Sequence, residues 1–257
     1  MTSVHPTAFV APGAELDPSV VVGPFCYVGS RVRIGAGTIL GPHVVVQGKT
    51  TIGERNHFVG QAAIGGKPQD LKYTGEESAL VIGDDNVVRE FVTINIGTAA
   101  GSWVTSVGNQ NLIMACAHVA HDCVIEDEVI IGNNVLLAGH VRIEDQSIIS
   151  GGTAVNHFVT IGSLAMVGGM SRVVKDVPPV MTIEGSPARV RGVNLVGLKR
   201  RGKADERCLR GIGNPAEHAF AEKGFADGKS IQTANQFSVV PGFHAMGISH
   251  PVQRTIS

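Results

Sequence analysis

The chain has 257 residues and a nearly balanced charge, with 21 Lys and Arg against 22 Asp and Glu. That balance argues against a broad nucleic-acid-binding surface. Aromatic residues make up only 5% of the chain while glycine occurs 33 times, so the interior must be built from small and β-branched side chains. We find neither a signal-peptide pattern nor an apolar run of membrane-spanning length, and therefore expect a cytoplasmic protein with no membrane span.

An apolar residue recurs at every sixth position along most of the N-terminal two thirds of the chain. A period of six matches neither an α-helix, at about 3.6, nor a simple strand, at about 2. It fits a triangular solenoid in which three hexads make one rung of 18 residues and the first residue of each hexad points inward. Rungs of this kind stack at about 4.8 Å, the spacing of paired strands. The repeat predicts an all-β parallel β-helix, with hexads that open at Val4, Val10, Leu16, Val22, Val28, Ile34, Leu40, Val46, Ile52, Phe58, Ile64, Ile82, Val88, Ile94, Val107, Ile113, Val119, Ile125, Ile131, Leu137, Ile143, Ile149, Val155, Ile161, Val167 and Val173.

The repeat is interrupted twice, near residues 65–81 and 97–106. Long excursions from a regular solenoid are often functional, and we expect both to be loops that leave the prism. The repeat stops after Pro179, which predicts a β-helix over residues 1–180 and a small C-terminal extension over 181–257. In this tail we expect irregular segments and short helices, opening near Val193, Asp205 and Asn214.

The repeat also predicts a cluster of histidines. Hexads whose first residues are 18 apart are stacked neighbours, so those opening at Val119, Leu137 and Val155 lie on one face. Two rungs span only about 10 Å. The third residues of these hexads, His121, Gly139 and His157, form a column. His118 lies at the corner before His121, and His140 lies beside Gly139.

Three interpretations of this cluster are open from the residues alone. Single histidines at solenoid corners are commonly just exposed polar side chains. Three imidazoles can also hold a catalytic zinc ion, as in the hexapeptide-repeat carbonic anhydrases. A histidine general base is the third, and Asp122 next to His121 is then a candidate for orienting it. The basic run at 199–201 is likewise either a solvated helix end or a phosphate-binding group.

Several segments together resemble one known family. They are QDLKY at 69–73, AHVAHDC at 117–123, AGH at 138–140, MVGG at 166–169, and the stretch 192–202 that ends in GLKRRG. Over about residues 1–203 the chain resembles the UDP-N-acetylglucosamine O-acyltransferases, with both loop insertions where that family has them. The resemblance implies a left-handed coil, a homotrimer with sites between subunits, and no cofactor or metal ion.

The resemblance also implies a reaction, the first step of lipid A biosynthesis. A histidine deprotonates the sugar 3-hydroxyl, which attacks the thioester of a 3-hydroxyacyl chain carried by acyl carrier protein. By motif that general base is His121, and Asp122 supports its protonated form. The N–H of Gly139, one rung away in the same column, would stabilise the oxyanion.

The remaining residues implied by the resemblance bind substrate. Glycine at position 169 acts in the family as a ruler that leaves the acyl groove open. The other positions contact the sugar nucleotide, with the first loop reaching in from a neighbouring subunit: Asp70, Lys72, His118, His140, His157, Asn194, Arg200 and Arg201.

The chain departs from the family pattern at a few positions. Asn95 stands where the family usually has His, Asn156 and His157 stand in place of a His-Gln pair, and Val196 replaces an acidic residue. These changes concern acceptor recognition and leave open whether the sugar carries a 3-hydroxyl or a 3-amino group. They also keep two alternatives open, a related N-acyltransferase and a non-catalytic trimeric scaffold. A metal-dependent hydratase fits less well, because it would give Gly139 no role.

Overall fold

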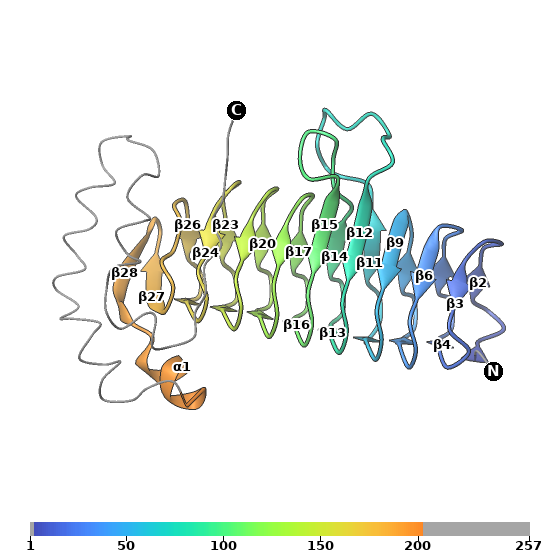
Figure 1. Ribbon diagram of the computed structural model, residues 1–257, viewed down its shortest axis with the longest axis horizontal. Helices are drawn as coiled ribbons and strands as arrows, with labels where there is room; N and C mark the ends of the chain where they lie inside the picture. Colours follow the sequence, from blue (N-terminus) through green and yellow to red (C-terminus); the bar gives the residue numbers. More distant parts are fainter. Residues whose placement is uncertain (1–2, 203–257) are drawn as a thin grey trace.

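The computed structural model describes residues 3–202, which form a long triangular prism (Figure 1). Each side of the prism is one sheet of short, stacked strands. Side A consists of β1 (Ser3–Val4), β4 (Val21–Val22), β7 (Ile39–Leu40), β10 (His57–Phe58), β13 (Val87–Val88), β16 (Leu112–Ile113), β19 (Ile130–Ile131), β22 (Ile148–Ile149), β25 (Met166–Val167), β27 (Met181–Gly185) and β28 (Ala188–Val193).

Side B consists of β2 (Phe9–Val10), β5 (Tyr27–Val28), β8 (Val45–Val46), β11 (Ala63–Gly66), β14 (Thr93–Asn95), β17 (His118–Val119), β20 (Leu136–Leu137), β23 (Ala154–Val155) and β26 (Arg172–Val173). Side C consists of β3 (Glu15–Leu16), β6 (Val32–Ile34), β9 (Lys49–Ile52), β12 (Ala79–Ile82), β15 (Val104–Val107), β18 (Val124–Ile125), β21 (Arg142–Ile143) and β24 (Thr160–Ile161). The chain visits the sides in the order A, B, C, and the corners are named A–B, B–C and C–A accordingly.

The strand register confirms the predicted stacking. Val119 pairs with Leu137, and Leu137 with Val155, all in parallel. The second residue of a typical strand points inward and is fully buried, and these residues form one continuous apolar core. The largest of them, Phe58, is completely inaccessible to solvent. Small and β-branched side chains therefore suffice, because the interior of each rung is narrow.

Both interruptions of the repeat leave the prism at the same corner. The first loop, residues 67–78, joins β11 to β12, and the second, residues 96–103, joins β14 to β15. Both thus run from side B to side C, in consecutive rungs, and they project together from one edge of the prism (cyan and green in Figure 1). The histidine cluster occupies the same B–C corner in the rungs that follow.

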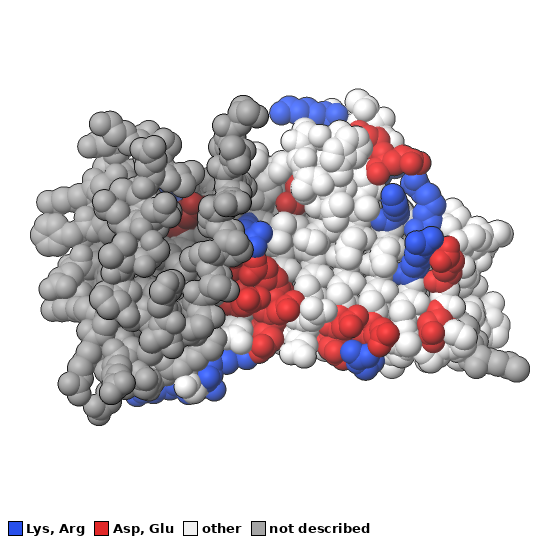
Figure 2. Space-filling view, viewed as in Figure 1, with Lys and Arg blue, Asp and Glu red and all other residues white. Residues whose placement is uncertain are grey.

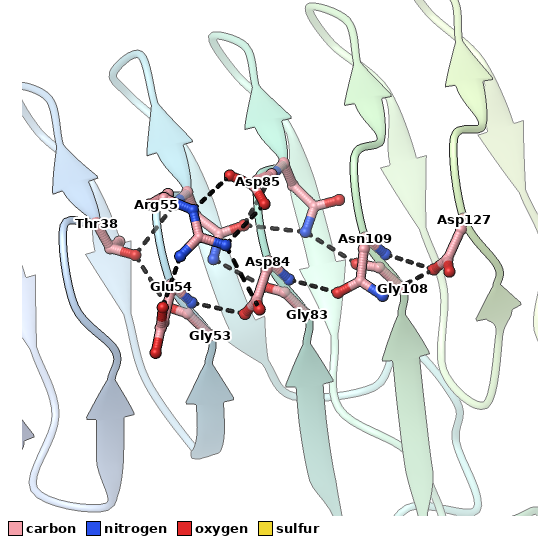
Figure 3. Close-up of polar contacts among 12 residues, drawn as sticks. Thr38, Gly53, Glu54, Arg55, Gly83, Asp84, Asp85, Gly108, Asn109 and Asp127 are labelled. Atoms are coloured by element: carbon pink, nitrogen blue, oxygen red, sulfur yellow. Dashed lines mark hydrogen bonds and ion pairs between the residues drawn. The ribbon is translucent and has the colours of Figure 1, made fainter.

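The C–A corner is closed by a ladder of polar side chains (Figure 3). The amide nitrogen of Asn56 donates to the carbonyl of Gly83, and Asn86 repeats this contact with Gly108 one rung further on. Outside this buried row, side-chain oxygens of Asn109 and Asp127 accept hydrogen bonds from the backbone of the preceding rung. The ladder satisfies turn amides and carbonyls that the strands leave unpaired.

The end of the described region differs from the expectation for the tail. Residues 181–193 form an antiparallel hairpin of β27 and β28 that continues side A, where short helices and irregular chain were expected. Its first strand pairs in parallel with β25 and so covers an edge that would otherwise expose unpaired backbone. The helix expected near Val193 is α1 (Leu195–Arg200). The helices expected at Asp205 and Asn214 lie outside the described residues. Within residues 3–202 no helix is long and apolar enough to cross a membrane.

Candidate active site

The predicted column of histidines lies along the B–C corner. The corner requires a left-handed backbone conformation at its fourth position, which Asp122, His140 and Phe158 adopt with φ of 59°, 63° and 64°. Aspartate and histidine tolerate this conformation better than most residues. Because the rungs are in register, these three residues and their neighbours follow one another directly along the edge of the prism.

His121 and Asp122 form a buried pair. Nδ1 of His121 lies 2.9 Å from Oδ2 of Asp122, and the two residues are 7% and 5% exposed. His121 thus points away from the apolar core, as the sequence predicts, yet it is covered by its surroundings. An ionised carboxylate only accepts hydrogen bonds, so Nδ1 carries the proton and Nε2 is left as the basic atom.

Hydrogen bonds keep Asp122 ionised. Burial by itself would raise the pKa of this carboxyl, but donors from Thr98, His121 and Ser102 outweigh it and leave the pKa below its ordinary value. Thr98 contributes both its hydroxyl and its N–H, at 2.6 and 3.1 Å, and the N–H of Ser102 lies at 2.9 Å. A negative charge is therefore fixed beside His121 near neutral pH.

Gly139 lies against the basic atom of His121. A Cβ placed on Gly139 would stand 2.6 Å from Nε2 and 2.5 Å from Cε1, so only glycine leaves the ring in its observed position. The N–H of Gly139 donates to no group among residues 3–202, whereas the N–H of the next residue, His140, bonds to the carbonyl of His121. A free amide and a free imidazole nitrogen thus share one small region.

The other histidines surround this pair. His140 contacts the ring of His121 edge-on, with centroids 5.1 Å apart, and stacks on Phe158 at 4.4 Å. His118 lies within β17 rather than at a corner, and its Nδ1 is 2.7 Å from the hydroxyl of Thr93. Burial, with neighbouring histidines, lowers the pKa of His118 and His140, although Asp122 acts in the opposite sense on His140. Both are neutral hydrogen-bonding groups at neutral pH. His157 follows on the next rung and is exposed.

The donor set also bears on the metal interpretation. His121, Asp122 and His140 each place one potential ligand atom within 4.8 Å of the others. However, both oxygens of Asp122 already accept hydrogen bonds, from Thr98, Ser102 and His121. A metal ion would have to displace several of these donors. The arrangement therefore fits a hydrogen-bonded acid–base pair better than a metal centre.

The remaining predicted residues are divided among the corners. Asp70, in the first loop of the same chain, acts against the burial that lowers the pKa of His140 and offsets a small part of it. Lys72 follows Asp70 in the exposed loop. Gly169 lies at the A–B corner, on a different edge from His121. Asn194 caps α1 and donates a hydrogen bond to the carbonyl of Leu164 at the C–A corner. Arg201 is held at the same corner by an ion pair with Glu128, and Arg200 is exposed. A single chain therefore does not bring Asn194, Arg200, Arg201 or Gly169 to His121.

Sequence reasoning did not identify the second loop as part of the site. Thr98, Gly101 and Ser102 surround the Asp122 carboxylate, and a Cβ on Gly101 would overlap it. The only signal in the sequence is the break in the repeat itself. The exposed ring of Phe158 was likewise missed, because a lone aromatic after a histidine has no distinctive pattern.

The hexapeptide-repeat coil and the comparisons with known proteins assign the chain to the hexapeptide-repeat acyltransferases. A model of bacterial transferase hexapeptide repeats matches residues 105–139, and a model of the second domain of UDP-N-acetylglucosamine O-acyltransferase matches residues 176–211. Two relatives, from Verminephrobacter eiseniae and a Synechocystis strain, are 50% and 57% identical over 202 and 204 residues. The match covers 79% of this chain in both cases, and 77% and 74% of the relatives. Both are named acyl-[acyl-carrier-protein]–UDP-N-acetylglucosamine O-acyltransferase.

Solved structures agree with the sequence comparison. The UDP-N-acetylglucosamine O-acyltransferase of Moraxella catarrhalis superposes with a TM-score of 0.85 at 37% identity, covering 95% of this chain and 93% of that one. LpxA of Acinetobacter baumannii gives 0.83 at 36% identity, with 93% and 90% covered. The chain belongs to the UDP-N-acetylglucosamine O-acyltransferase family, and the predicted left-handed parallel β-helix is confirmed.

Proposed function

We propose that this protein transfers a 3-hydroxyacyl chain from acyl carrier protein to the 3-position of UDP-N-acetylglucosamine, the first step of lipid A biosynthesis, in the cytoplasm. The observation that carries the proposal is the placement of Nε2 of His121 beside Gly139, with Nδ1 held by a buried, ionised Asp122. The names of the relatives supply the two substrates.

The geometry supports a general-base mechanism. Nε2 of His121 takes the proton of the attacking sugar hydroxyl, whose oxygen forms a bond to the thioester carbonyl carbon. The carbonyl oxygen becomes negative, and the free N–H of Gly139 is positioned to stabilise it. Asp122 stabilises the imidazolium that forms. When the tetrahedral intermediate collapses, the carbon–sulfur bond breaks, and the departing thiolate of the carrier protein takes the proton from His121 and leaves as the thiol.

The surface of the prism supports a homotrimer. Most outward residues along the middle of sides A and B are apolar, and none is Lys, Arg, Asp or Glu: Val87, Leu112, Ile130, Ile148 and Met166 on side A, and Val45, Ala63, Thr93, His118, Leu136 and Ala154 on side B. Side C mixes uncharged outward residues such as Val81 and Val124 with the charged Glu15, Arg33 and Arg142. Figure 2 shows acidic and basic side chains near one another on the face in view. Three copies that each pack side A on a neighbour's side B form a closed ring.

Such a ring also completes the site. It places the A–B corners near the threefold axis and sets the B–C corner of each subunit beside the C–A corner of its neighbour. His121 of one subunit would then face the neighbour's α1, with Asn194 and Arg200, which a single chain keeps at a different corner. The groove between the two subunits would run inward toward the A–B corner, where Gly169 lies.

The test is mass spectrometry of the products formed from UDP-N-acetylglucosamine and a set of 3-hydroxyacyl carrier proteins. An O-ester at the 3-position is the expected product. If product forms only with a 3-amino sugar nucleotide, as an amide, the acceptor group of this enzyme is an amine and not a hydroxyl. Absence of transfer to either acceptor, with a folded trimer, would contradict the enzymatic proposal and favour a binding scaffold.

A further inference from the structure

The second loop forms a clamp around the Asp122 carboxylate. Oδ1 accepts hydrogen bonds from the backbone N–H groups of Thr98 and Ser102, at 3.1 and 2.9 Å. Oδ2 accepts from the hydroxyl of Thr98 at 2.6 Å and from Nδ1 of His121 at 2.9 Å. Thr98 itself is only 2% exposed, and glycine at position 101 is needed because a Cβ there would overlap the carboxylate.

We propose that Thr98 is a positioning residue for the reaction, and that its hydroxyl tunes the proton affinity of the general base through Asp122. The proposal rests on the function proposed above. The hydroxyl of Thr98 and Nδ1 of His121 share one carboxylate oxygen, Oδ2. Every hydrogen bond that Oδ2 receives from Thr98 reduces the negative charge it presents to His121. The loop thereby limits how strongly Asp122 favours the protonated imidazole.

The loop is itself held by the other loop. The carboxylate of Glu76 accepts from the N–H and hydroxyl of Thr74 and from the N–H of Ala99, which follows Thr98 directly. The hydroxyl of Ser78 donates to the carbonyl of Gly97 on the other side of Thr98. Both neighbours of Thr98 are therefore fixed by residues 67–78, the loop that carries Asp70 and Lys72.

The backbone half of the clamp makes the proposal testable. Thr98→Val keeps the shape of the side chain and both backbone donors on Oδ1, and removes only the hydroxyl on Oδ2. The carboxylate then stays in place while Oδ2 binds the imidazolium more strongly. Since the neutral imidazole is the active base, the acid limb of the kcat/KM profile should move to higher pH. We expect roughly 0.5 to 1 pH unit, less than the one to three units that a full neighbouring charge produces.

Other titratable groups lie near His121 and Asp122, and their surroundings must be the same in wild type and in the variants. They are His118 on β17, His140 and His157 on the next two rungs, and Asp70 of the first loop. None of them contacts the hydroxyl of Thr98, so its removal leaves them in place.

The experiment compares wild type, Thr98→Val, Thr98→Ser and Ser102→Ala in the full-length protein. The pH profile of kcat/KM is measured for acyl transfer, and the Cε1 signal of His121 is titrated by NMR without substrate. Thr98→Ser keeps the hydroxyl and should match wild type. Ser102→Ala loses a hydroxyl 3.3 Å from Oδ1, the oxygen that does not touch His121, and should move the acid limb less than Thr98→Val does.

The outcomes separate the proposal from its alternatives. An upward displacement that is larger in Thr98→Val than in Ser102→Ala and absent in Thr98→Ser, in both profile and titration, supports the tuning role. A lower rate at every pH with an unmoved acid limb and an unmoved NMR midpoint would overturn it and leave Thr98 a purely structural residue. Equal displacement in Thr98→Ser would overturn it as well. If the wild-type protein transfers no acyl group, the proposed function fails, but the NMR titration still decides whether Thr98 tunes His121.

Discussion

Two corners of the same prism use polar side chains in opposite ways. At the C–A corner, Asn56 and Asn86 are buried, and their side chains bond to the turn carbonyls and amides of the next rung. At the B–C corner, His121 and Asp122 are equally buried, but Nε2 of His121 and the N–H of Gly139 bond to nothing among residues 3–202.

The difference shows what turns a structural corner into a reactive one. Asn56 and Asn86 have side-chain donors and acceptors that match the backbone of the next rung, so their hydrogen-bonding capacity is used within the coil. Histidine directs one nitrogen to Asp122 and leaves the other available, while the second loop, held by the first, packs against the Asp122 carboxylate. Removing a group from the C–A corner should therefore cost stability, and removing one from the B–C corner should cost activity.

The largest effect is expected at the general base. His121→Ala should lower kcat by about 10²–10⁴-fold, the usual contribution of a general base. Its melting temperature should stay near that of wild type, because the side chain is not part of the apolar core. Steady-state kinetics and thermal unfolding measure both quantities. The exposed His5, substituted by Ala, is the matched control and should change neither. Activity within a few-fold of wild type would remove His121 from the mechanism.

The opposite result is expected at the C–A corner. Asn86→Ala leaves the carbonyl of Gly108 and the N–H of Asn111 without partners in the interior. Unsatisfied buried groups of this kind cost about 1–3 kcal/mol each, so the melting temperature should fall by several degrees. The kcat at a temperature where the variant is folded should be unchanged. Asn109→Ala, in the half-buried outer row, should lower the melting temperature much less, since water can replace its contacts. An equal fall in the melting temperature of both variants would show that the buried row and the outer row stabilise the corner alike.

Gly139→Ala tests whether the B–C corner needs the amide and the imidazole to be adjacent. The added methyl group would overlap the imidazole of His121, so the ring must move away from its place beside the amide. A displacement of about 1 Å can lower a rate by roughly 10²-fold. We expect a loss of that size in kcat, with the oligomeric state of wild type unchanged by light scattering. Wild-type kcat in a folded Gly139→Ala variant would show that this amide and ring need not be adjacent.

A smaller effect is expected at the helix. Arg200 is exposed and available, whereas Arg201 pairs with Glu128 of its own chain. If Arg200 holds phosphate in the ground and transition states alike, Arg200→Ala should raise KM for the sugar nucleotide about tenfold with little change in kcat. Arg201→Ala is the matched comparison and should raise KM less. An unchanged KM in Arg200→Ala would make this residue part of a solvated helix end.

The smallest effect concerns chain length. A Cβ on Gly169 would lie 3.3 Å from the carbonyl of Gly151, so a larger side chain can be accommodated by pointing away from the coil. Gly169→Met should shift the preference from longer toward shorter 3-hydroxyacyl chains, and Gly169→Ala should shift it less. Competition between long and short acyl carrier substrates measures the shift. A folded Gly169→Met variant with the wild-type preference would remove the glycine from the acyl groove.

The hexad register alone placed the column of the candidate site correctly. Because parallel strands in a solenoid repeat with a fixed period, residues 18 apart, such as His121 and Gly139, must be neighbours whatever the loops do. The pairing of His121 with Asp122 was also predictable, since both lie in the same turn. The hairpin at 181–193 was not, because antiparallel pairing depends on which edge the last rung leaves open.

The sequence by itself determined the coil, its inward residues and the edge on which the histidines gather, because these follow from a short-range repeat. Only the tertiary structure decided that residues 96–103 fold back onto Asp122 and that both loops share the corner of His121. It also decided that α1 lies at another corner, beside Leu164 and Glu128. Loops and termini have no period, so their positions depend on side-chain contacts between distant segments that no local pattern encodes.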